Sequence, residues 1–236
     1  MVRAWQRWLS PRPLTRTNIS TQMSFVTAGN AARYDIINEP NGRWGCRETH
    51  YIDNPRVKAG LSGPPLHLHF KQDEFFKVEQ GILAVISQGK EHHLTKDDGV
   101  FAVRAGSRFC GFRVDVETSH RFWSHPSATE SLVFYAWPDP CKDVDHILDI
   151  NFLRNAVGYL GDCEREGLKP SVFQVILFYQ HASSIWTPPF LNWVHASILN
   201  VVQYVVAYWV AVGVLGYKPS YPEYTSGLKS DLGDTT

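Results

Sequence analysis

The hydrophobic pattern of the chain is that of short strands over its middle part. Between residues 44 and 137, short runs of residues that favour β-strands alternate with tight polar turns such as Lys96-Asp97-Asp98-Gly99. Many short strands at regular spacing are typical of an antiparallel sandwich or barrel. We therefore predict one antiparallel barrel here. The expected strands are residues 47–52, 65–70, 74–78, 82–87, 91–94, 100–103, 109–116, 120–123 and 131–137.

After Pro138-Asp139-Pro140, the apolar residues recur at helical spacing instead. Residues 144–166 predict a helix that ends at Gly167. Residues 170–217 contain no Asp, Glu, Lys or Arg, and Pro188-Pro189 divides them into two apolar runs. The second run is long enough to cross a bilayer, which requires about 20 mostly apolar residues. We expect a buried helical hairpin packed on the barrel or on a second subunit; a membrane-embedded or membrane-surface hairpin is the alternative.

These changes of pattern divide the chain into four parts. We expect a turn-rich N-terminal arm (1–43) with at most two strands, a barrel (44–140), a helical extension (141–218) and a loose tail (219–236). The predicted fold class is mainly β with an α extension. The segment before Pro11 lacks the apolar core of a secretory signal, so we expect a cytoplasmic protein, with membrane association as the alternative.

The composition is that of a folded protein with a neutral surface. Hydrophobic residues make up 44% of the chain and charged residues 19%, while 23 basic residues balance 23 acidic ones. Without net charge or a dense basic cluster, nucleic-acid binding is not expected. The aromatic content of 13% suits a deep apolar pocket. The four cysteines form no CxxC pair, which favours reduced thiols over a zinc finger or a disulfide framework: Cys46, Cys110, Cys141 and Cys163.

The strongest chemical signal lies at the start of the predicted barrel. His67 and His69 are one residue apart in an extended context, so both side chains point to the same side of a strand. Glu74 returns to the same place if the polar Lys71-Gln72-Asp73 segment forms a turn. Two imidazoles and one carboxylate form a divalent-metal site with open positions, or an acid–base cluster without metal.

The spacing His67-x-His69-x4-Glu74-x6-Gly81 resembles the first motif of the cupin superfamily, small β-barrels of the germin and isomerase type. The resemblance implies an antiparallel cupin jelly roll with a small-molecule pocket, and cupins commonly pair into homodimers. It also implies metal ligation by His67, His69 and Glu74.

The second cupin motif is much weaker. Arg104-Ala105-Gly106 resembles its glycine-rich turn, with Arg104 in place of proline, and Phe109 stands where the last metal histidine of the family falls. That departure leaves a metal site of two histidines and one carboxylate, or a barrel that no longer binds metal.

The role of the motif depends on whether metal binds. Iron suits oxygenase chemistry, whereas zinc or manganese suits Lewis-acid polarisation of a carbonyl. Without metal, a histidine is the natural general base and Glu74 the natural acid, its pKa raised by desolvation.

Further candidates are weaker signals. Arg113 has the strand parity of Phe109, so it reaches the pocket to bind a carboxylate or enolate, or else forms a salt bridge at the rim. Tyr135 is a proton donor in the last strand or a packing residue, and His50 is a similar candidate. His120 or His125 replaces the missing histidine only if its loop folds back into the mouth of the barrel. The pair His92-His93 lies beside a turn and indicates solvated surface. The aromatic residues expected in the substrate pocket are Phe70, Phe76, Phe101 and Phe109.

We therefore predict a small-molecule tailoring enzyme. The overall pattern, a single degenerate cupin domain with a long helical C-terminal extension, resembles the tailoring cupins of fungal polyketide pathways. The resemblance implies an oxygenated, hydrophobic substrate. The absence of a metal histidine at position 109, where Phe109 stands, favours acid–base dehydration, isomerisation or cyclisation. Metal-dependent oxidation with iron, zinc or manganese is the alternative. A non-catalytic ligand-binding barrel is a further alternative. We also predict a homodimer. Association of residues 170–217 with a membrane surface is a further alternative.

Overall fold

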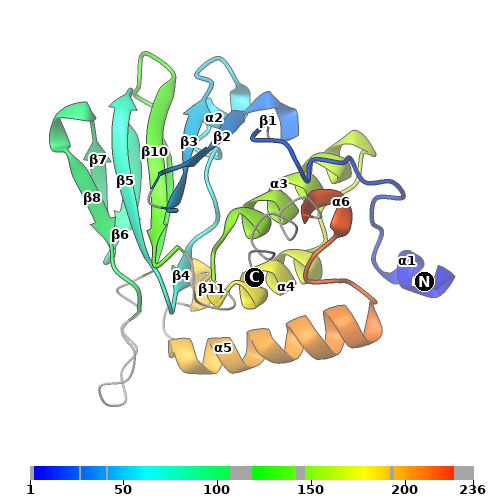
Figure 1. Cartoon of the computed structure of the whole chain (residues 1–236). Coiled ribbons are helices and arrows are strands. Elements are labelled where there is room, and N and C mark those ends of the chain that lie inside the picture. Colours follow the sequence, from blue (N-terminus) through cyan, green and yellow to red (C-terminus); the bar gives the residue numbers. More distant parts are fainter. Residues whose placement is uncertain are drawn as a thin grey trace, which may run out of the picture.

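Two antiparallel sheets form the β part of the protein (Figure 1). A computed structural model describes residues 3–26, 28–40, 42–106, 119–141, 147–191 and 194–225. The six-stranded sheet has the order β1 (Ser24–Val26), β2 (Ala32–Asn38), β3 (Trp44–His50), β10 (Leu132–Asp139), β5 (Asp73–Gln80) and β8 (Val100–Val103). The five-stranded sheet has the order β11 (Ser184–Trp186), β4 (His67–His69), β9 (His120–Ser124), β6 (Leu83–Ser87) and β7 (Lys90–Leu94).

The β core lies between the two sheets. Phe76 of β5 and Phe134 of β10 meet Phe122 of β9, with ring centroids 4.9 to 5.6 Å from the Phe122 ring. Leu83 and Val85 of β6 add fully buried aliphatic side chains to the same cluster. Because strand side chains alternate between faces, each strand gives every second residue to this core. The predicted antiparallel jelly roll is confirmed.

Strands from outside residues 44–140 complete both sheets. β1 and β2 of the N-terminal arm extend the larger sheet by pairing in sequence with β3. β11, which comes from the uncharged stretch, pairs with β4 so that Ser184 lies opposite His69. The strand expected at residues 109–116 lies outside the described residues.

The described residues between 147 and 225 are mainly helical, as predicted. α3 (Ile150–Arg165) begins where the Asp149 side chain accepts a hydrogen bond from the Phe152 amide at 2.7 Å. It ends at Arg165, and Gly167 just beyond the cap has a φ of 65°, which suits the left-handed turn that closes a helix. The other elements are α4 (Val172–His181), α5 (Ala196–Tyr204), the π-helix η5 (Val205–Val214), α1 (Ala4–Leu9), α2 (Pro55–Lys58), α6 (Pro222–Thr225), η1 (Ala28–Asn30), η2 (Lys96–Asp98) and η4 (Pro189–Leu191).

α5 and η5 form one continuous helix along the edge of the molecule, beneath α4 in Figure 1. Within the described residues, Ala196–Val214 is the one helix whose length and composition suit a membrane span, with a mean hydropathy of 1.6 and 17% of it buried. One side packs on α4 through Ala207, Ala211 and Leu215. The other side exposes Val201 and Trp209, at 64% and 71%. The expected burial of this hairpin is therefore incomplete within a single chain.

We expect a second copy of the chain to cover this exposed face. Burial of apolar surface contributes about 25 cal/mol per Å², and closed two-fold dimers are the commonest soluble oligomers. Light scattering on protein purified without detergent should give about twice the chain mass of 26.8 kDa. The monomer mass at micromolar concentration would contradict the dimer, and a protein that needs detergent to stay monodisperse would support membrane contact instead.

Candidate metal centre

Three histidines meet on the inner face of the smaller sheet. His67 and His69 lie on β4 with ring centroids 4.8 Å apart, and both are buried. β4 pairs with β9 so that His67 lies opposite His120, and the His120 ring is 4.4 Å from His67 and 5.1 Å from His69. The pairing of two strands that are remote in sequence therefore adds a third imidazole to the motif.

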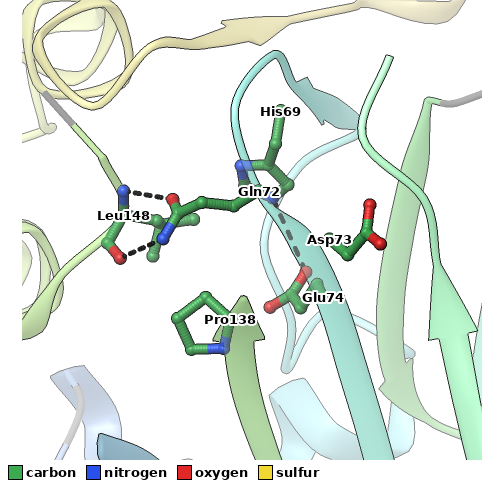
Figure 2. Close-up of a pocket in the computed structure, with 6 residues that line it drawn as sticks. All are labelled: His69, Gln72, Asp73, Glu74, Pro138 and Leu148. Atoms are coloured by element: carbon green, nitrogen blue, oxygen red, sulfur yellow. Dashed lines mark hydrogen bonds and ion pairs between the residues drawn. The ribbon is translucent and has the colours of Figure 1, made fainter. Parts of the chain in front are cut away.

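Glu74 approaches the histidines from the larger sheet. It lies at the start of β5, and its Oε2 is 2.8 Å from His120 Nε2 and 3.6 Å from His69 Nε2. Figure 2 shows Glu74 pointing toward His69, and Gln72 turned away from both. Buried Gln72 donates to the carbonyls of Pro140 and Leu148 and accepts from the Leu148 amide. The expected polar turn is thereby anchored to the segment that leads into α3.

These four side chains form a compact ligand set. One possible ligand atom from each of His67, His69, Glu74 and His120 lies within 4.8 Å of the others. The sequence favoured the first three, whereas His120 was only an alternative whose loop had to fold back. The available signal for His120 was its place in an expected strand, but strand pairing could not be read from spacing. Phe109, at the usual position of the last histidine, lies outside the described residues.

Hydrogen bonds on the far side of the rings orient the imidazoles for metal binding. His67 Nδ1 donates to the Pro65 carbonyl at 2.8 Å, which leaves its Nε2 as the lone-pair nitrogen. His69 Nδ1 lies 2.8 Å from the Ser184 hydroxyl, and this hydroxyl donates to the Ala182 carbonyl. Ser184 therefore accepts from His69, whose buried Nε2 has no hydrogen-bond partner. An orphaned imidazole nitrogen and fixed tautomers fit a metal ligand.

Burial and charge give the cluster the protonation states that metal ligands require. Burial, and then the charges of His120 and His69, hold the pKa of His67 well below its ordinary value. Burial also lowers the pKa of His69. For Glu74, burial acts to raise the pKa, but the His120 and His69 rings beside the carboxylate outweigh burial and lower the pKa. The expectation of a raised pKa for Glu74 is wrong, because its neighbours favour the carboxylate.

An apolar cavity opens onto the cluster. Its volume is about 350 Å³, and His67 and Glu74 form part of its wall. α3 and α4 close it on the side away from the strands, and the Tyr179 ring of α4 lies 5.5 Å from the His67 ring. The cavity can therefore hold a small hydrophobic molecule beside the cluster. Its aromatic lining includes Tyr34, Trp44, Phe122, Phe152, Phe178 and Tyr179.

Several fungal proteins have sequences similar to this chain. No family model matches the chain. Oxidoreductase iacF of Pestalotiopsis fici is 55% identical over 92% of this chain and 100% of its own length. Probable oxidoreductase virH of Hypocrea virens is 49% identical over 95% of each chain. The chain belongs to this family of fungal oxidoreductases.

More distant members include epoxidase atD of Aspergillus terreus, 34% identical over 93% of this chain and 69% of atD. The family places the chain among enzymes, as the sequence predicted. The His67–Gly81 motif and the two-sheet jelly roll make it a cupin.

Among solved structures, the Schizosaccharomyces pombe Cnp3 cupin domain is 14% identical, covering 58% of this chain and 72% of its own, with a TM-score of 0.31. A sugar phosphate isomerase of the cupin superfamily from Silicibacter pomeroyi is 14% identical, covering 56% and 83%, with a TM-score of 0.35.

Three of the expected aromatic residues, Phe70, Phe76 and Phe101, do not line the cavity. Phe76 lies in the core between the sheets, and Phe101 packs against that core. Phe70 packs against a buried cluster that contains Leu68 of β4 and Ala196 of α5. Different aromatic side chains line the cavity because the helices, whose packing the strand pattern does not encode, supply a large part of its wall. Phe109 and Arg113 lie outside the described residues.

Other predicted residues lie away from the cluster. Tyr135 donates to Glu39 at 3.1 Å on the opposite face of β10 from buried Phe134, and burial and Glu39 raise the pKa of Tyr135 to about 12. His93 is exposed near Glu91 and His125 at the surface. His92 is half-buried, with its ring 5.0 Å from the Phe101 ring. His50 is fully buried beside the cavity residue Glu48.

Alkaline pH should destabilise this enzyme, because tyrosines that line the cavity, Tyr34 and Tyr179 among them, are buried in their neutral form. Burial, and then the charge of Glu48, raises the pKa of Tyr34, and burial and Glu74 raise the pKa of Tyr179. Above about pH 10, the unfolded chain releases protons that the folded state retains. The free energy of unfolding should therefore fall by about 1.4 kcal/mol per pH unit for each group. Urea denaturation at a series of alkaline pH values measures this slope. Tyr34→Phe should reduce it by about one group, and an unchanged slope would contradict the assignment.

Proposed function

We propose that this protein is a metal-dependent oxidoreductase that modifies a small, oxygenated hydrophobic molecule. The observation that carries the proposal is the set of four convergent ligand atoms, including an orphaned buried Nε2, beside an apolar cavity whose wall includes His67 and Glu74. The redox names of the relatives iacF and virH support the same reaction class. The cavity supports a hydrophobic substrate, because its wall is mostly aromatic and aliphatic.

His67, His69 and His120 would hold the metal through imidazole nitrogens, and Glu74 through its carboxylate. A bound iron or manganese ion supplies one-electron chemistry and activation of dioxygen. The carbonyl of Pro65 and the hydroxyl of Ser184 fix two of the imidazoles.

The helices give the site its second property, a dry environment. Phe152 of α3 and Tyr179 of α4 pack edge to face, with ring centroids 5.5 Å apart, and both line the cavity. Their rings exclude water from the reacting centre and hold an apolar substrate beside His67. Such exclusion strengthens electrostatic interactions with the substrate and suppresses side reactions. We place the enzyme among tailoring steps of fungal secondary metabolism, with a polyketide-like substrate.

Metal analysis and chelation test this function. Protein purified without chelator should contain about one iron or manganese per chain. Dialysis against a chelator should abolish conversion of the compound that accumulates when the gene is deleted from its host, and adding back the divalent ion should restore it. A metal-free protein that converts this compound at an unchanged rate after chelation would contradict the proposal.

A second candidate is acid–base dehydration, isomerisation or cyclisation without metal. The observation that favours it is the 2.8 Å contact between Glu74 Oε2 and His120 Nε2, which forms a ready proton-transfer pair. Chelation distinguishes the two reactions, because the acid–base reaction keeps its rate when metal is removed. The products differ too, since dehydration and isomerisation leave the oxidation state of the substrate unchanged.

A further inference from the structure

A second carboxylate lines the same cavity, and the metal centre does not use it. Glu48 lies on the inner face of β3, between Cys46 and His50, and is 4% exposed. Among the described residues that line the cavity, Glu48 and Glu74 are the two that carry carboxylates. A carboxylate buried in an apolar wall is costly unless it is hydrogen-bonded, so its partners indicate its role.

Those partners form a chain of hydrogen bonds behind Glu48. Ser62 Oγ accepts from the Ser124 amide at 3.2 Å and lies 2.9 Å from His50 Nδ1. Since the amide occupies an acceptor position of Ser62, the Ser62 hydroxyl is free to donate to His50 Nδ1. His50 then carries its proton on Nε2, which donates to Glu48 Oε2 at 3.2 Å. The Tyr34 hydroxyl donates to Glu48 from β2.

We propose that Glu48 is the proton acceptor for a hydroxyl group of the substrate, with His50 and Ser62 as its supporting relay. This inference rests on the proposed function and names the group that the cavity recognises. The substrate is a hydrophobic phenol or enol whose hydroxyl faces Glu48 while another part of the molecule faces His67. The substrate O–H bond breaks, the electron pair stays on the substrate oxygen, and the proton forms an O–H bond on Glu48.

The surroundings of Glu48 make its carboxylate a stronger base than an exposed one. Burial raises the pKa of Glu48, whereas hydrogen bonds from His50 and Tyr34 oppose the rise. The titratable groups that interact with Glu48 are Tyr34 of β2, Cys46 and His50 of β3 and Glu74 of β5. Arg56 of α2, His67 of β4 and Tyr179 of α4 line the same cavity. A catalytic base is most effective when its pKa approaches the working pH, so a raised carboxylate pKa favours this role.

Substitution of Glu48 tests the proposal with the compound that accumulates in the gene-deletion strain. Glu48→Gln keeps the shape of the side chain but cannot accept the proton, so kcat should fall about 10²-fold or more. Glu48→Asp should recover part of the loss. In the wild type, kcat should fall at acid pH as Glu48 becomes protonated, and this acidic limb should disappear in Glu48→Gln. Glu79→Gln, an exposed glutamate on β5 paired with Arg47, is the matched control and should behave as wild type.

Further measurements separate this inference from the proposed function. Glu48→Gln should bind as much metal as the wild type, because Glu48 is not among the four ligands. If Glu48→Gln does not fold, His50→Phe removes the N–H donor and should move the acidic limb to higher pH. Near-normal kcat with an unchanged limb in Glu48→Gln would overturn the inference even if chelation abolishes activity. Chelation-insensitive turnover that still requires Glu48 would overturn only the proposed metal chemistry.

Discussion

Replacing His67 or Glu74 by alanine should lower turnover by about 10²-fold or more and reduce the bound metal below one ion per chain. Each substitution removes one of four convergent ligand atoms, and outer partners alone commonly change metal affinity or activity by about 10- to 100-fold. Loss of a ligand itself should therefore cost at least as much. The measurements are kcat on the accumulating compound, metal content of the purified variant, and circular dichroism to show that the fold survives.

Residues away from the four-ligand cluster provide matched controls for these substitutions. His93→Ala changes an exposed histidine on β7 and should leave kcat unchanged, as should His92→Ala. Tyr135→Phe should also retain activity, because its hydroxyl binds Glu39 away from the cluster. His120→Ala should match His67→Ala, although sequence spacing gave it less weight. Full activity in a His67→Ala, His69→Ala double variant would contradict the assignment of these histidines to the catalytic metal centre.

Gly63→Ala should lower the free energy of unfolding by about 3 kcal/mol or more, the upper end of the usual cost of overpacking. A Cβ on Gly63 would lie 1.5 Å from the carbonyl oxygen of Phe122 and 2.7 Å from its carbonyl carbon. These atoms belong to the backbone of β9 and cannot rotate away. β9 also carries His120, so the displaced strand should weaken metal binding as well. Urea denaturation and metal titration measure the two effects.

Gly161→Ala is the control for that substitution. Gly161 lies within α3, and a Cβ there meets nothing within 4 Å. Alanine in a helix is favoured over glycine by about 1 kcal/mol, so this variant should be as stable as the wild type or more stable. If Gly63→Ala proves as stable as Gly161→Ala, the close packing of the motif lead-in against β9 is contradicted.

Local sequence pattern determined much of this protein. The one-residue spacing of His67 and His69 placed both imidazoles on one face of β4, because side chains alternate along a strand. The polar turn before Glu74 brought the carboxylate back to them. The shift from period two to helical spacing after residue 140 predicted α3, and Gly167 marked its end. These features depend on neighbours within a few residues, so one sequence is sufficient to reveal them.

Only the tertiary structure decided the rest, because it depends on contacts between segments far apart in the chain. His120 joins the cluster through the pairing of β4 with β9, whose register no local pattern encodes. β11 supplies Ser184 to orient His69 from a stretch that sequence indicated as helical. α3 and α4 close the cavity with their own aromatic side chains. The prediction that Phe70, Phe76 and Phe101 line the pocket is therefore wrong. Glu48 became a cavity residue for the same reason, since a strand pattern shows which face is buried but not what lies opposite it.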